Sequence, residues 1–198
     1  MIPADNFEYV GFGWRVLAAL VDAAIGFALM PVSITLMNYS WAHRTIIPGI
    51  AHSVIWTVFW MWLIVKFGAT PGKMVIKARI VNANGEFLNW QRAFMRMLFP
   101  GLLISINSLL QRYHAMNAAP PEASINTFWE VGRAINQYGY PFLRMFGMFL
   151  GLTVYIDVLV VLLNKRKRAI HDFIAGSFVV KKDSLTKTVI QQPQTRAE

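Results

Sequence analysis

Two aspartates lie inside long apolar stretches of this sequence, where a charged carboxylate is energetically unfavourable unless other groups stabilise it. Asp22 falls within GWRVLAALVDAAIGFALM, and Asp157 falls near the end of a later apolar run. A charged side chain at membrane depth costs roughly 2.5–3.5 kcal/mol on insertion scales. Two neighbouring carboxylates cannot both ionise cheaply, so the pKa of one of them rises. Such a pair can exchange a proton for a cation, which makes Asp22 and Asp157 candidate ion- or proton-binding residues.

Arginines close to the same depth supply the opposite charge. Arg15 precedes Asp22 by seven residues, two helical turns, so both lie on one helix face about 10 Å apart in depth. Asp157 precedes Asn164 by seven residues, again about 10 Å from the polar end of its helix. We therefore expect both aspartates in one layer, with Arg15 and Arg96 tuning their charge. The alternative is a structural ion network that fixes the register of the helices.

A histidine and an aspartate stand side by side in NKRKRAIHDFIAGSFVVKK, just beyond the last apolar run. His171 and Asp172 form a possible proton relay, because histidine titrates near neutral pH. The alternative is that they cap and anchor a short helix that Gly176 ends. The other three histidines have no metal-ligand spacing, the chain has no cysteine, and no catalytic or nucleotide-binding motif is present. We predict no enzyme activity, no cofactor and no metal centre.

Apolar helices must position these side chains. Hydrophobic residues make up 56% of the 198 residues, against about 45–50% in an ordinary soluble domain, and the mean hydropathy is +0.42. A transmembrane helix needs about 20 mostly apolar residues. The first such segment is too long for the core of a signal peptide, so we expect it to be retained. The sequence predicts an all-α membrane protein, a four-span helical bundle with spans over residues 14–37, 46–66, 93–110 and 142–163. The third of these, with Pro100 inside it, is expected to be shorter or broken.

Basic residues are distributed unequally between the two sides of this four-span topology. Fifteen of the 19 Lys and Arg residues fall on one side. The positive-inside rule places that side, and with it both termini, in the cytoplasm. The same residues suit anionic lipid headgroups, so the net charge of +9 needs no nucleic-acid partner. Because four short helices leave little room for a transport machine, we also expect a homo-oligomer.

Short elements are predicted outside the spans on the cytoplasmic side. Residues 75–81 alternate with strand periodicity, and residues 177–182 supply a second short strand. Between them, Asn84-Gly85 is a strong turn signal. We expect a small cytoplasmic β element that joins the middle loop to the C-terminal segment.

The other side of the membrane is predicted to carry one helix. Residues 125–139 place their apolar side chains on one face, which is typical of an extracytoplasmic helix lying along the interface. It would connect the spans, or act as a lid over the bundle. Residues 184–198 are polar and are expected to be disordered, which leaves residues 1–183 as a single domain.

Three motifs resemble the RDD family of bacterial membrane proteins, named for one arginine and two aspartates. They are GWRVLAALVDAAI, GATPGKMVIKARIVNANGEFLNWQRAFMR and YIDVLVVLLNKRKRAIHDFIAGSFVV, which together cover well over a third of the chain. Arg15 and Asp22 match the first two signature positions. The second aspartate is Asp157 or Asp172, and we favour Asp157 for its depth.

The resemblance implies a multi-pass protein of the bacterial inner membrane, and cation/proton antiport is attributed to some members. We therefore expect transport of a monovalent cation, such as sodium against protons, through the Arg/Asp/Asp layer. The alternative is a non-transporting membrane scaffold or accessory subunit whose polar layer is structural.

Overall fold

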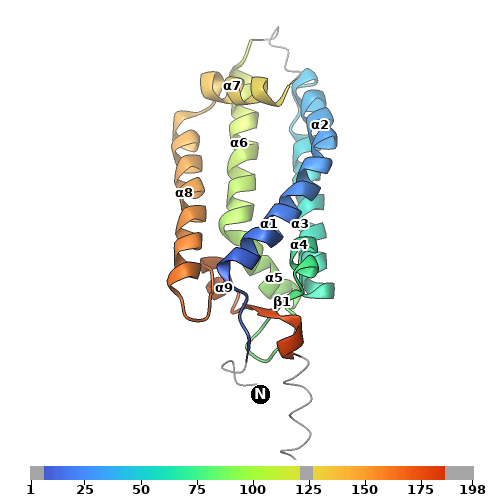
Figure 1. The fold of residues 1–198 in the computed structure, drawn as a ribbon. Helices are drawn as coiled ribbons and strands as arrows, with labels where there is room; N and C mark the ends of the chain where they lie inside the picture. Colours follow the sequence, from blue (N-terminus) through green and yellow to red (C-terminus); the bar gives the residue numbers. More distant parts are fainter. Residues whose placement is uncertain (1–6, 121–126, 186–198) are drawn as a thin grey trace, which may run out of the picture. The chain divides into compact units, whose positions relative to one another are not determined.

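The computed structural model describes residues 7–120 and 127–185, which are mostly helical (Figure 1). The chain forms two compact units, each assembled from segments that are distant in sequence. Unit 1 comprises Met1–Ile25, Phe59–Leu98 and Ile156–Glu198, and unit 2 comprises Gly26–Val58 and Phe99–Tyr155.

Long apolar helices cover much of the chain. Among the described residues, two segments are long and apolar enough to cross a membrane: Ile47–Val75, which contains α3 (Ile47–Phe67), and Pro141–Leu163, which is α8. They coincide with the second and fourth predicted spans.

The first predicted span, residues 14–37, is a bent pair of helices. α1 (Phe12–Ala28) and α2 (Met30–Ala42) meet at an angle of 50° and pass the length and hydropathy test only together. Pro31 lies in the first turn of α2, where its missing N–H and its ring interrupt the hydrogen bonds of a continuous helix. The span count is thus two, or three with this pair, over the residues that the structure describes.

The predicted span over residues 93–110 is interrupted. It is divided among α5 (Trp90–Met97), the π-helix η2 (Leu98–Leu102) and α6 (Leu103–Ala118). Phe99 has extended backbone angles, φ −123° and ψ 130°, because the ring of the following proline disfavours a helical conformation in the residue before it.

In unit 2, α7 (Phe128–Tyr138) lies across the end of α6 (Figure 1). A capping box between Thr127 and Glu130 begins the helix and satisfies two backbone N–H groups. The helix predicted over residues 125–139 is therefore shorter at its start, and its first two residues, with the rest of 121–126, lie outside the described residues. A buried apolar cluster joins α2, α6 and α7, consisting of Met37, Trp41, Ala115, Met116, Ala119, Val131 and Ala134.

In unit 1, β1 (Ala78–Val81) and β2 (Phe178–Lys181) form an antiparallel ladder, with Ile80 opposite Val179. Ile80 and Val179 are fully buried in the core of this unit. The N-terminal segment joins the ladder, because the Val10 N–H donates to the Val179 carbonyl. Gly85 has a φ of 81° in the turn after β1, a conformation that glycine adopts without strain.

The strand predicted over residues 75–81 occupies only the second half of that range. Its start is taken by a short helix, α4 (Pro71–Val75), and Lys77 has a left-handed φ of 54° between helix and strand. A matching short helix, α9 (Ile170–Ile174), precedes β2. The polar tail predicted over 184–198 is described only to residue 185; residues 186–198 lie outside the described part.

Candidate functional site

Asp22 of α1 binds the start of α4. One carboxylate oxygen accepts a hydrogen bond from the Gly72 N–H at 2.7 Å, and the other accepts from the Thr70 hydroxyl at 2.6 Å. The first N–H groups of a helix have no partner within it, and a carboxylate there also interacts favourably with the helix dipole. The cost of placing Asp22 in an apolar helix is therefore offset by its capping of α4.

Gly72 permits this contact because it has no side chain. A β-carbon at this position would lie 1.9 Å from the Ala18 carbonyl oxygen and 3.0 Å from the Asp22 carboxyl carbon. The first contact is shorter than real β-carbons make and the second is unusually tight. The nearest atom belongs to the α1 backbone, which cannot rotate away. The glycine thus lets the backbone of α4 touch α1.

Asp157 of α8 binds the start of α9 in the same way. Its carboxylate accepts from the Ile170 N–H at 2.6 Å and contacts Nδ1 of His171 at 2.6 Å. The side chains of Asp157 and His171 are 13% and 26% exposed, so neither is completely buried within the protein. Nε2 of the same imidazole lies 3.9 Å from the Asp172 carboxylate, which places His171 between two aspartates.

Asp172 is the most completely buried of the site's charged groups, with a fully buried side chain. It forms ion pairs with Arg96, whose side chain is 5% exposed, and with Arg15, at 3.0 Å. It also accepts from the Ala169 N–H at 3.0 Å and from the Ser177 hydroxyl at 3.2 Å. One carboxylate therefore joins α1, α5, α9 and the residue before β2.

These contacts keep Asp172 ionised. Burial alone would raise the pKa of the Asp172 carboxyl, but the charges of Arg96, His171 and Arg15, with the Ala169 N–H, hold it well below its usual range. Asp172 is therefore a permanent anion at the centre of the site. One nitrogen of Arg15, Nη2, has no hydrogen-bond partner among the described residues, although its other nitrogens bind Asp172 and the Val10 carbonyl.

Arg168 fixes the turn that follows α9. Its guanidinium donates to the carbonyls of Asp172 and Ser177, at 2.9 and 3.2 Å, and lies 4.1 and 4.5 Å from the ring centres of Phe173 and Phe178. Gly176, predicted to end the short helix, has a left-handed φ of 60° just after it. The tight turn brings Ser177 back to Asp172.

The structure gives the sequence-predicted residues different partners from those expected. All six lie in unit 1, but Asp22 and Asp157 cap separate short helices, and no hydrogen bond or ion pair joins them among the described residues. Arg15 and Arg96 contact Asp172 instead. Of the two aspartates considered for the second family signature, it is thus Asp172, not the favoured Asp157, that pairs with Arg15.

Three contributors were missed from the sequence: Thr70, Gly72 and Ser177. The signal was present in GATPGK, because a threonine followed by proline and glycine is a typical start of a helix. No group of three His, Cys, Asp or Glu side chains in the described part of the chain could hold a metal ion.

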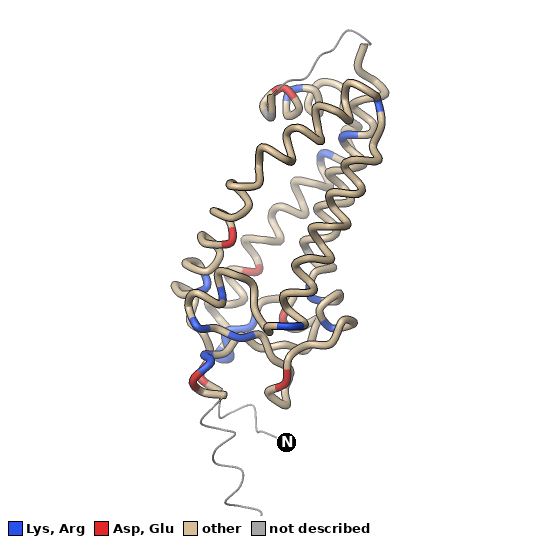
Figure 2. The backbone as a smooth tube through the Cα atoms, turned by 90° about the vertical axis from the view of Figure 1, so that its right-hand side faces the viewer, with Lys and Arg blue, Asp and Glu red and all other residues tan. Residues whose placement is uncertain are grey.

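Lys and Arg gather around the ladder and the short helices of unit 1 (Figure 2). Unit 1 thus combines short helices capped by aspartates, surrounding charged residues and the ends of long apolar helices. The family model described as the RDD family matches residues 9–176, a range that includes every residue of the site except Ser177. Searches of curated proteins and of solved structures found no match. The match covers most of the chain, which therefore belongs to the RDD family of membrane proteins.

Proposed function

We propose that this RDD-family protein couples the movement of a monovalent cation, such as sodium, to protons, and that Asp157 and His171 bind the proton. The observation that carries the proposal is the position of the imidazole between two carboxylates, 2.6 Å from Asp157 and 3.9 Å from Asp172. A histidine changes charge near neutral pH. An imidazole flanked by acids and partly open to solvent is a suitable proton acceptor and donor.

The remaining charges have distinct roles in this proposal. Asp172 is a fixed anion that stabilises the protonated imidazole, while Arg15 and Arg96 prevent it from taking the proton itself. Asp22 is the candidate cation ligand, because its carboxylate and the neighbouring Thr70 hydroxyl are oxygen donors of the kind that hard cations prefer. Cation binding would have to compete with the bonds that Asp22 makes to α4.

The membrane arrangement is part of the same proposal. Four spans, with the broken segment 93–110 as the third, place both termini and the β ladder in the cytoplasm of a bacterium, and the protein in its inner membrane. Anionic lipid headgroups then face the basic residues of unit 1. A homo-oligomer provides more helices around a transport pathway than four short spans can. The proposed transport involves no enzyme activity.

A non-transporting scaffold or accessory subunit is the second candidate. It is favoured by the fact that both oxygens of Asp22 are already occupied by α4. In this case the capped helices serve only to hold the β ladder beside the apolar helices.

Proton flux in proteoliposomes separates the two functions. Purified protein is reconstituted with a pH-sensitive dye inside the vesicles, and sodium, potassium or lithium gradients are applied. We expect cation-driven proton movement that is lost in Asp157→Asn and His171→Gln, because the asparagine still accepts from the Ile170 N–H while its charge is gone. Asp183→Asn, a change at an exposed position, is the matched control and should transport normally.

Two results would contradict the proposal. Flux that persists in both variants rejects the assignment of the proton to this pair. Folded wild-type protein that moves protons with none of the three cations supports the scaffold instead.

A further inference from the structure

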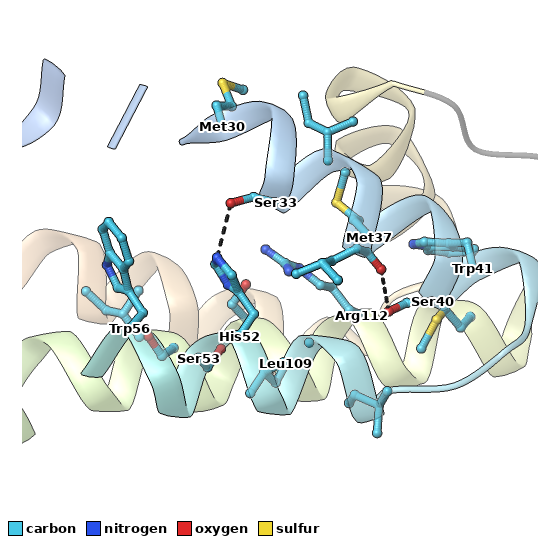
Figure 3. Close-up of a pocket in the computed structure, with 18 residues that line it drawn as sticks. Met30, Ser33, Met37, Ser40, Trp41, His52, Ser53, Trp56, Leu109 and Arg112 are labelled. Atoms are coloured by element: carbon cyan, nitrogen blue, oxygen red, sulfur yellow. Dashed lines mark hydrogen bonds between the residues drawn. The ribbon is translucent and has the colours of Figure 1, made fainter. Parts of the chain in front are cut away.

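Unit 2 contains a pocket of about 310 Å³ lined by α2, α3 and α6 (Figure 3). Its walls combine methionine, leucine and tryptophan side chains with a few polar groups, among them Ser33, His52 and Arg112. Small-molecule sites have about this volume and this composition, mostly apolar with a small number of polar groups. The pocket is thus large enough for a ligand, and its polar groups indicate which kind.

Arg112 is the only charged residue that lines the pocket. Its side chain extends from α6 into the space, with the guanidinium on the side of Ser33 and His52 (Figure 3). Its Nε is buried without a hydrogen-bond partner, and within the described ranges no carboxylate forms an ion pair with it. Arg112 is half-buried, and a cation that is partly removed from water without a counter-charge is costly, so a bound anion would stabilise it.

A second unpaired donor lines the same pocket. Trp41 of α2 is only 6% exposed, and its indole N–H has no hydrogen-bond acceptor in the described part of the chain. Buried tryptophan N–H groups usually find a partner. Nearby, Ser33 and His52 contact one another at 3.2 Å. The pocket therefore offers unused donors at two places and an apolar surface between them.

The protein itself supplies little negative charge here. The segments of unit 2 carry four arginines, two glutamates, and neither lysine nor aspartate. One of the glutamates, Glu130, is engaged in the capping box of α7, and the other, Glu122, lies outside the described residues. The described residues of unit 2 therefore supply no carboxylate for Arg112.

We propose that this pocket binds an amphiphilic oxyanion, a carboxylate or phosphate attached to an apolar group. The guanidinium of Arg112 pairs with the oxyanion, as arginine does with planar and phosphate oxygens in other proteins. The aromatic and methionine side chains cover the apolar group, and the Trp41 N–H donates to a further oxygen of the ligand. The ligand is either an anionic lipid headgroup or a free aromatic or aliphatic acid. The site is independent of the proton pair in unit 1.

Binding to the purified full-length protein tests the proposal. Titration calorimetry with phenyl phosphate and benzoate, and with benzamide as the uncharged isostere of benzoate, measures the preference for an anion. Native mass spectrometry with phosphatidylglycerol and phosphatidylcholine tests the lipid source. Arg112→Gln is the main variant, Arg112→Lys keeps the charge, and Arg133→Gln, at an exposed arginine of α7, is the matched control.

We expect one of the two sources to bind, with at least about tenfold preference for the anion over its uncharged counterpart, since a charged hydrogen bond in a buried site is worth this much. Arg112→Gln should lose that preference, Arg112→Lys should keep part of it, and Arg133→Gln should equal the wild type. Trp41→Phe should weaken anion binding about threefold by removing one neutral donor.

Either of two results would overturn the proposal. The first is wild-type protein that binds neither anion class more tightly than the neutral probes, a result that holds even if a variant fails to fold. The second is anion binding that folded Arg112→Gln retains in full. Loss of proton flux in the Asp157 or His171 variants has no bearing on either outcome.

Discussion

Arginines that are largely or partly buried have opposite surroundings in the two units. In unit 1, Arg15 and Arg96 share the carboxylate of Asp172, which also accepts hydrogen bonds from the backbone and from Ser177. In unit 2, the guanidinium of Arg112 has an aromatic and methionine-rich cavity beside it and no carboxylate among the described residues. The first arrangement joins four chain segments, whereas the second leaves binding capacity unused. An arginine that is paired with a carboxylate of the same chain thus has a structural role. An arginine without such a partner is a candidate for binding a ligand.

The largest loss of stability is expected when the shared carboxylate of Asp172 in unit 1 is removed, which tests its structural role directly. Asp172→Asn leaves two buried arginines without their counter-charge. Breaking a buried ion pair on one side typically costs about 3–5 kcal/mol, so we expect a loss of this size in the free energy of unfolding, measured by denaturation in detergent micelles. Asp183→Asn is the control. A loss below about 1 kcal/mol would mean that the cluster does not hold the unit together.

A smaller effect is expected where α4 touches α1. In Gly72→Ala the new methyl group meets the Ala18 carbonyl oxygen at 1.9 Å, and the helices must move apart. Overpacking of this kind typically costs about 1–3 kcal/mol, which a lower unfolding temperature would report. Gly26→Ala is a matched control within α1, because a methyl group there meets nothing within 4 Å and alanine favours a helix. Equal stability of the two variants would contradict the close contact.

The smallest change in stability is expected for a substitution of Arg112 in unit 2. Arg112→Met removes a half-buried cation that has no carboxylate partner among the described residues and replaces it with an apolar side chain. We expect the unliganded protein to unfold within about 1 kcal/mol of the wild type, or to be more stable, because no ion pair is lost and a desolvated charge is removed. Chemical denaturation of delipidated protein measures this. A loss as large as that of Asp172→Asn would place Arg112 among the structural cations.

The sequence identified the charged residues of the site but not their pairing. Helical spacing gives the depth of a side chain such as Asp22, whereas its partner depends on the direction in which the helix faces and on which distant segment packs there. Arg15 illustrates the limit, because it shares a helix face with Asp22 and yet bonds to Asp172, far along the chain. The pairing follows from tertiary packing, to which a single sequence gives little access.

Short elements were the other limit. Five-residue helices such as α4 and α9 are unstable alone, so only the residues that begin and end them mark them in the sequence. Asp22 and Asp157, carried by other helices, stabilise their first turns. The break at Phe99 has a local cause in the proline that follows it, and the sequence accordingly predicted a shorter or broken span there. By contrast, the apolar runs of α3 and α8 were long enough to identify from hydropathy.

The ladder has a consequence for biosynthesis. The backbone of Tyr9 and Val10 bonds to β2, so the ribosome must translate nearly the whole chain before the first residues of this unit find their partner. Until then β1 presents an open edge to the surroundings, and unpaired edges invite association with other chains. A truncated product that stops before Phe178 keeps that edge exposed, which makes it a natural target for cellular proteases.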